Sequence, residues 1–173
     1  AAWTSFVTGV NPGAHGVYGF VDREPASYQQ YITGTGYVRS PQIWRTLNDR
    51  GRKVIIMNVP VTAPPMEVDG MMVSGFLAPS LDGATHPPDL KDRLERHGYR
   101  IDIDPWKARE SLDLLFEDLD ATLAGRVAGA QDLLQNESWS YAMVHIMGTD
   151  RINHLVWGKW ADRDEQFAPR FVD

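Results

Sequence analysis

Two short apolar runs, each beside a segment with helical spacing, constrain the fold of this chain most strongly. The first run, 53–58, directly follows a predicted helix that begins after Ser40-Pro41. The second run, 140–147, precedes a segment of helical pattern at 151–160. Short apolar runs are typical of strands that are buried on both faces. Strands that alternate with helices favour an α/β fold with a mainly parallel sheet and helices on both of its faces.

The remaining pattern adds elements around these two strands. Apolar residues keep helical spacing over 104–135, so we expect one long amphipathic helix that bends at Gly125 or Gly129. We also expect helices at 3–8 and 89–96, a strand at 71–76 and an edge strand at 99–103.

Composition excludes several classes of protein. The chain has 173 residues, of which 43% are hydrophobic and 23% charged, as in an ordinary globular domain. It has no cysteine, which excludes disulfides, thiolate metal sites and a cysteine nucleophile. The formal net charge of −6 is opposite to that of proteins that bind a nucleic acid polymer. No apolar run approaches the roughly 20 residues of a membrane span. We therefore expect a cytoplasmic protein without membrane or nucleic acid polymer among its partners.

Both ends of the sequence look cut. Segment 1–7 is apolar and starts without an initiator Met or a polar lead, as if inside an element. Segment 167–173 stops on apolar residues without a polar tail. We therefore expect this chain to be an internal fragment of a longer protein.

Asp150 and His154 are the strongest candidates for a functional site. Ligands of open α/β sheets bind beyond the carboxyl ends of strands, and Asp150 follows the strand predicted at 140–147. His154 lies four residues later, so both side chains share one helix face and can reach one cation. A carboxylate with an imidazole suits Zn²⁺ or Mn²⁺. The spacing alone is not specific, because Asp82 and His86 repeat it in a proline-rich loop. In the alternative interpretation, Asp150 caps the helix and His154 is a polar residue that is half-buried or lies on the surface.

Other polar motifs have structural explanations. His15 lies in a turn sequence and is expected to bond the backbone, and His97 and His145 are expected to be structural. Segment 33–36 (Thr-Gly-Thr-Gly) lacks the spacing of a phosphate-binding loop. The basic cluster at 50–53 suits the end of a helix.

Three stretches carry a resemblance to one family. They are 1–16 (Ala-Ala-Trp-Thr-Ser-Phe-Val-Thr-Gly-Val-Asn-Pro-Gly-Ala-His-Gly), 58–65 (Asn-Val-Pro-Val-Thr-Ala-Pro-Pro) with 73–76 (Val-Ser-Gly-Phe), and 148–154 (Gly-Thr-Asp-Arg-Ile-Asn-His). In this order they resemble the type I phosphodiesterase and nucleotide pyrophosphatase family of the alkaline phosphatase superfamily. Asp150 and His154 match the Asp-x-x-x-His pair of that family, so the resemblance implies that both are metal ligands.

The resemblance implies an alkaline-phosphatase-like fold, present here in incomplete form, and a hydrolase mechanism. In the family, two divalent metals, usually zinc, flank a Thr or Ser nucleophile that attacks phosphorus in line, and water releases the covalent phosphoryl-enzyme. Such metals make a bound hydroxyl more acidic and neutralise charge on the phosphoryl oxygens. For this chain the resemblance implies two zinc ions, with manganese as the alternative, and a small phosphoester or nucleotide substrate.

The departures from the family concern residues outside the matching stretches. The nucleophile of the family precedes the position of Ala1, so Thr4 and Thr8 are not its equivalents. One Asp ligand is expected upstream, and an Asp-His pair and a last His are expected beyond Asp173. Some relatives place a phosphate-binding Asn near the position of Phe20. We therefore expect the chain to hold two ligands of one metal and to be inactive alone.

The domain prediction is one partial domain over 1–173. Its core segments are expected at about 1–80 and 139–173, with a helical, cap-like region at about 81–138. The predicted function is a fragment of a metal-dependent phosphodiesterase or nucleotide pyrophosphatase. The alternatives are a phosphomonoesterase, phosphonate hydrolase or sulfatase of the same superfamily, and a non-catalytic α/β binding domain.

Overall fold

A mostly parallel sheet forms the centre of the fold. The computed structural model describes the backbone of residues 1–161, and their side chains except those of 105, 108, 109 and 158–161. Within these residues, a four-stranded sheet has the order β5-β4-β3-β6. Its strands are β3 (Val54–Val59), β4 (Gly70–Ser74), β5 (Thr85–His86) and β6 (Tyr141–Val144). β3 runs parallel to β4 and β6, whereas β5 is antiparallel to β4. The predicted α/β class is confirmed.

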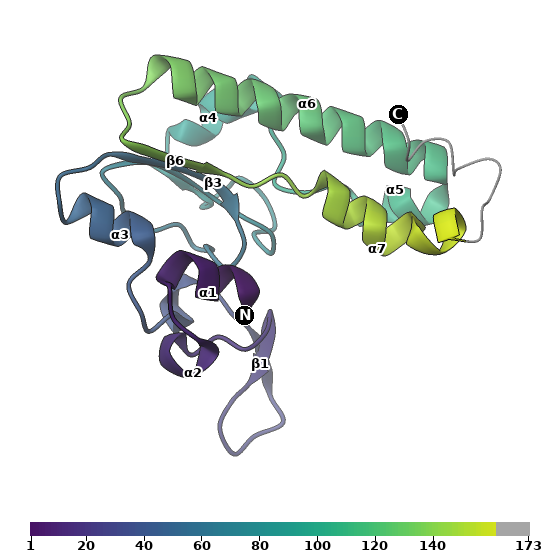
Figure 1. Cartoon of the computed structure of the whole chain (residues 1–173). Coiled ribbons are helices and arrows are strands. Elements are labelled where there is room, and N and C mark those ends of the chain that lie inside the picture. The colour runs from purple at the N-terminus through teal and green to yellow at the C-terminus, as the bar shows by residue number, and fades with distance from the viewer. Residues whose placement is uncertain (162–173) are drawn as a thin grey trace.

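Helices lie on both faces of this sheet (Figure 1). One face carries α4 (Leu90–Glu95) and the long α6 (Leu112–Asn136), and the other carries α1 (Ala2–Thr8) and α3 (Ile43–Asn48). After β6 the chain enters α7 (Gly148–Ala161), which lies beside α6 and α5 (Pro105–Glu110). The remaining elements are α2 (Pro12–His15), the 3₁₀-helix η1 (Thr35–Tyr37), and a hairpin of β1 (Val21–Arg23) and β2 (Gln30–Ile32). No helix in the described part of the chain is long and apolar enough to cross a membrane.

Strand β3 organises the core, because all of its side chains are buried. Successive residues of a strand point to opposite faces of the sheet. Ile55 and Met57 therefore pack on the α4 and α6 side, while Val54 and Ile56 pack on the α1 and α3 side. Their buried helical partners are Leu94 and Leu133 on the first side, and Val7 and Trp44 on the second. The buried strand predicted at 53–58 is confirmed.

The edge strand predicted at 99–103 is wrong. This segment is a loop that runs beneath α6, and Tyr99 and Ile101 join the hydrophobic core that α6 covers. Arg126 of α6 donates hydrogen bonds to the carbonyl oxygens of Arg100 and Ile101. A side chain thus satisfies backbone groups that a neighbouring strand would otherwise bond. The alternating pattern of the sequence reflects a loop with one buried side.

The helix predicted over 104–135 is two helices, separated at Ser111. Ser111 is extended, with φ −157° and ψ 157°, and its hydroxyl accepts a hydrogen bond from the Leu114 N–H to cap α6. The change of direction within 104–135 thus occurs between α5 and α6 rather than at Gly125 or Gly129. A Cβ at Gly125 would lie 2.3 Å from the Gly98 carbonyl oxygen, so this glycine allows α6 to approach the loop closely.

Two further boundaries differ from the prediction. The apolar run at 140–147 forms only a short strand, β6, and its residues are half-buried because β6 is the edge strand of the described sheet. The helix predicted to begin after Ser40-Pro41 begins at Ile43, with Gln42 in the capping position. Neither difference changes the order of strands and helices.

An ion cluster joins α4 to α6. The Arg93 guanidinium donates from Nε and Nη2 to the Asp132 carboxylate, at 2.7 and 3.0 Å, and also contacts Glu137. His97 Nε2 lies 3.0 Å from the same carboxylate, and Asn136 donates to it at 2.7 Å. The hydrogen bonds from Arg93, Asn136 and His97 hold the pKa of Asp132 well below its ordinary value of 3.8.

We predict that this cluster makes the fold acid-sensitive. A carboxyl group whose pKa is lower in the folded state stabilises the fold above its unfolded pKa, and this stabilisation is lost as the pH falls through the folded pKa. The free energy of unfolding should therefore fall below about pH 4, and less steeply in Asp132→Asn. Urea unfolding between pH 7 and pH 3 measures the free energy of unfolding of the unchanged protein and of Asp132→Asn. An equal dependence on pH in the two proteins would contradict the prediction that Asp132 causes the acid sensitivity.

We predict that Gly70→Ala destabilises the sheet by about 2 kcal/mol or more. Gly70 starts β4 at φ +133°, and an added Cβ would lie 1.9 Å from the carbonyl oxygen of Val54 on β3. Backbone atoms of the central strand cannot move aside without disturbing both hydrophobic clusters. Gly36→Ala is the matched control, because a Cβ there meets nothing within 4 Å. Urea unfolding compares the two variants, and equal stabilities would refute the prediction.

Candidate functional site

Asp150 and His154 lie together on α7, just beyond the carboxyl end of β6. Asp150 is in the first turn of α7 and His154 follows one turn later. His154 Nε2 lies 3.5 Å from Asp150 Oδ1, and 74% and 51% of the respective side-chain surfaces are exposed. The structure therefore places the two predicted residues on one open helix face. Asp150 lies within the helix rather than before it, so its position is not that of an N-cap.

The donor set of this pair fits a divalent cation. A carboxylate oxygen and an imidazole nitrogen within 3.5 Å of each other can converge on one ion of the Zn²⁺ or Mn²⁺ type. No group of three or more His, Asp, Glu or Cys residues with metal-binding geometry occurs in the described part of the chain. Asp150 and His154 alone would fill half of a tetrahedral zinc shell. The assignment of both residues as ligands stays a prediction.

Arg151 anchors the first turn of α7. Its guanidinium makes a two-pronged ion pair with Asp102, and the Nε bond is 3.0 Å. It also lies over the ring of Phe76, 4.7 Å from the ring centre, and 3.8 Å from the Asp150 carboxylate. These contacts connect α7 to the loop beneath α6 and to the end of β4. They fix the helix turn from which Asp150 projects.

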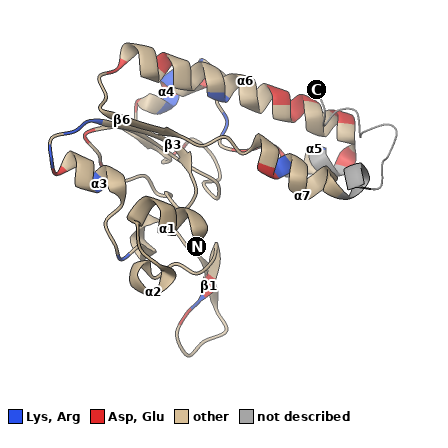
Figure 2. Ribbon diagram, viewed as in Figure 1, with Lys and Arg blue, Asp and Glu red and all other residues tan. Residues whose placement is uncertain are grey.

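Phe20 packs against Phe76, the residue whose ring also contacts Arg151 in the first turn of α7. Its ring meets the ring of Phe76 edge to face, with centres 5.0 Å apart. Because Phe76 also contacts Arg151, the ring of Phe76 links Phe20 to the first turn of α7. Figure 2 shows no charged residue on α1 and α2, and residues 1–20 contain no Lys, Arg, Asp or Glu. Residues 1–20 therefore supply no positively charged side chain for binding a phosphoester.

Asn58 marks the carboxyl end of β3 and was not among the predicted site residues. It is fully buried with φ +63°, and both atoms of its side-chain amide lack a hydrogen-bond partner among the described residues. His145 Nδ1 lies 3.0 Å from the Asn58 carbonyl oxygen, which can only accept, so Nδ1 carries the proton. Burial lowers the pKa of His145 despite this bond. The sequence feature that could have pointed to Asn58 is its place as a polar residue at the end of the apolar run 53–58.

His15 is a structural residue, as predicted from its turn sequence. Its ring is buried, and Nδ1 accepts a hydrogen bond from the Val17 N–H at 3.1 Å. Burial lowers the pKa of His15, which favours the neutral ring. With Nδ1 accepting, the proton of the neutral ring lies on Nε2, which donates to Ser5 Oγ at 2.9 Å. His15 in this state cannot remove the Ser5 proton, so the pair is not a nucleophile and its base.

The remaining motifs have other contacts. Asp82 pairs with Lys91, whereas His86 contacts the Val68 carbonyl oxygen, so this second acid-histidine spacing brings no two ligands together. In segment 33–36, a Cβ at Gly34 would lie 2.2 Å from the Ala63 carbonyl oxygen. The Thr35 N–H donates to that carbonyl oxygen at 3.0 Å and the Thr35 hydroxyl donates to the Pro64 carbonyl oxygen at 2.7 Å, so both donors already have partners within the protein.

The fold defines an α/β protein, and the predicted pair lies at the carboxyl edge of its sheet, where proteins of this class usually bind ligands. The family model described as type I phosphodiesterase / nucleotide pyrophosphatase matches residues 1–168, and the chain belongs to this family. Membership identifies a hydrolase family that acts on phosphoester bonds. Neither a curated protein nor a solved structure matches the chain.

We predict that Ser5→Ala leaves the rate of phosphodiester hydrolysis unchanged while costing about 1 kcal/mol of stability, the contribution of one hydrogen bond. The reason is that Ser5 Oγ accepts from His15 Nε2 and is not activated for attack. Initial rates on a p-nitrophenyl phosphodiester and urea unfolding measure the two effects. Loss of the rate with unchanged stability would show that Ser5 has a chemical role.

Proposed function

We propose that this chain is part of a metal-dependent phosphodiesterase or nucleotide pyrophosphatase, in which Asp150 and His154 hold one of two divalent cations. The pair on one exposed face of α7, with 3.5 Å between His154 Nε2 and Asp150 Oδ1, carries the proposal. Family membership supports the phosphoester class. Zinc is the proposed metal and manganese the alternative, because one carboxylate and one imidazole suit both.

Asp150, His154 and Arg151 have different roles in this proposal. Asp150 and His154 would supply one oxygen and one nitrogen ligand, and Arg151 would fix the turn between them through Asp102. When bound, the cations would neutralise charge on the phosphoryl oxygens and make an attacking hydroxyl more acidic. From the resemblance we expect that Thr or Ser hydroxyl before the position of Ala1. We therefore assign the nucleophile and the remaining ligands to segments other than residues 1–173.

A small phosphoester or nucleotide is the proposed substrate. The formal charge of −6 disfavours a polymer with many phosphates, whose binding depends on clustered Lys and Arg. The carboxyl edge of the sheet, where α7 begins, is the usual place for a small ligand in this class of fold. The proposed compartment is the cytoplasm.

We predict that Asp150→Asn and His154→Ala each weaken Zn²⁺ binding by the 173-residue chain at least about tenfold, because removing even an outer contact of a metal site costs about 10–100-fold. Competition with a coloured chelator measures the affinity, and circular dichroism checks the fold. Asp82→Asn is the matched control, since Asp82 has the same spacing to a histidine that it does not contact. Equal Zn²⁺ affinity in the unchanged chain and the three variants would show that Asp150 and His154 are not metal ligands.

The full-length gene product tests the reaction. With Zn²⁺ or Mn²⁺ it should hydrolyse p-nitrophenyl phosphodiesters, and both variants should lower the rate. Comparison of diester, monoester, phosphonate and sulfate substrates separates a phosphodiesterase from the related hydrolases. Absence of turnover on all of them would reject the enzyme proposal and leave a non-catalytic binding domain.

A further inference from the structure

His145 lies at the carboxyl edge of the sheet, where it contacts both β3 and α1. It is the first residue after β6, and its backbone N–H donates to the Met57 carbonyl oxygen of β3 at 2.9 Å. Its ring meets the ring of Trp3 on α1, with centres 4.4 Å apart. Asp150 follows five residues later, in the first turn of α7. His145 thus lies on the edge where α/β sheets usually bind their ligands.

A left-handed backbone segment holds the His145 ring. Asn58 in β3 and Val61 in the turn after it have φ +63° and φ +66°, and such a conformation is costly for a β-branched residue. The Asn58 carbonyl oxygen accepts a hydrogen bond from His145 Nδ1 at 3.0 Å. Because this bond fixes the proton on Nδ1, Nε2 carries the lone pair of the neutral ring. Backbone outliers of this kind cluster at functional sites.

The other ring nitrogen of His145, Nε2, is open to a ligand. It has no partner among the described residues, and it is not one of their enclosed polar atoms. In the other four histidines of the described chain, Nε2 lies beside a protein partner; these are His15, His86, His97 and His154. No hydrogen bond or ion pair between described residues joins His145 to the predicted metal ligands. His145 therefore presents an oriented acceptor with nothing bound to it in the protein.

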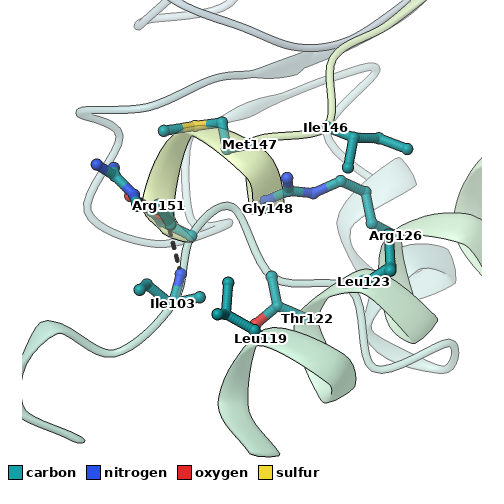
Figure 3. Close-up of a pocket in the computed structure, with 10 residues that line it drawn as sticks. Ile103, Leu119, Thr122, Leu123, Arg126, Ile146, Met147, Gly148 and Arg151 are labelled. Carbon is teal, nitrogen blue, oxygen red and sulfur yellow. Dashed lines mark hydrogen bonds and ion pairs between the residues drawn. The ribbon is translucent and has the colours of Figure 1, made fainter. Parts of the chain in front are cut away.

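Burial and two cations favour the neutral ring. Burial is the largest cause that lowers the pKa of His145 below its ordinary value of 6.5, and Arg126 and Arg151 lower it further. The hydrogen bond to β3 and the charge of Asp150 act in the opposite direction without outweighing them. Segment 146–148, directly after His145, lines one small cavity together with both arginines (Figure 3). α1 and β3 contribute no charged side chain. The neutral ring can accept a proton at Nε2 near pH 7.

We propose, on the basis of the function proposed above, that His145 is a proton acceptor of the phosphoester site, where Nε2 takes the proton of the attacking hydroxyl. That hydroxyl is expected shortly before the position of Ala1, and α1, which begins at Ala2, contacts the His145 ring through Trp3. As the proton moves to Nε2, the attacking oxygen forms its bond to phosphorus, and the bond to the leaving oxygen breaks with its electron pair on that oxygen. The imidazolium then releases the proton to solvent.

The full-length gene product with saturating Zn²⁺ tests this role on a p-nitrophenyl phosphodiester. Its kcat/KM should fall as the pH falls through the lowered pKa of His145, because a protonated Nε2 can no longer accept. His145→Asn keeps a donor for the Asn58 carbonyl oxygen and removes Nε2. It should lower kcat/KM at pH 7 about 100-fold or more and abolish this pH dependence.

His86→Asn is the matched control, because His86 lies on β5, at the opposite edge of the described sheet, and should keep the full rate. Zn²⁺ affinity and circular dichroism should be unchanged in His145→Asn, which separates a lost proton acceptor from a lost ligand or a lost fold. Nitrogen NMR of the 173-residue chain measures the tautomer directly. The proton should lie on Nδ1 of His145, with a pKa below 6.5.

Turnover with equal kcat/KM in His145→Asn and the unchanged protein would overturn this proposal and leave the proposed function standing. Absence of turnover on every ester would overturn both. A neutral ring with its proton on Nε2 would overturn the proposal even if the rate falls. His145→Gln, which also lacks a basic nitrogen, takes the place of His145→Asn if that variant does not fold.

Discussion

The complete burial of strand β3 is the constraint on which the rest of this structure depends. Alternate side chains of one strand enter two separate hydrophobic clusters, so β3 requires helices on both faces of the sheet. The connection from β4 to its parallel neighbour β6 contains α4 and α6, which cover one face, whereas α1 and α3 of the other face precede β3. The carboxyl ends of all three strands then meet at one edge. Asn58, His145 and the start of α7 lie at that edge for this reason.

The first turn of α7 is held by long-range charge rather than by local sequence. Arg151 pairs with Asp102, which is 49 residues earlier in the chain, and stacks on Phe76 at the end of β4. Asp102 lies in the loop beneath α6, the same loop whose carbonyl oxygens Arg126 satisfies. The loop at 99–103 thus connects α6 to α7, and the geometry of Asp150 depends on how well that loop is ordered.

Local patterns in the sequence predict the parts of this structure that depend on local physics. The buried run of β3 and the four-residue spacing of Asp150 and His154 belong to this group, because strand and helix periodicity determine them. The loop at 99–103 does not, since its alternation arises from packing against α6. The half-buried state of β6 depends on its place at the sheet edge. The positive φ of Asn58 and the burial of Arg126 depend on residues distant in sequence, so local patterns do not predict either.

The surroundings of Phe20 limit how this chain can bind a phosphoester. A phosphate near Phe20 would meet an aromatic ring, which cannot donate the hydrogen bonds of an amide. Arg151 is close by, but its Nε and Nη2 bond the Asp102 carboxylate, and its Nη1 lies 3.8 Å from the Asp150 carboxylate. In the proposed function, bound cations rather than these side chains would neutralise the phosphoryl charge, in keeping with the absence of charged residues on α1 and α2.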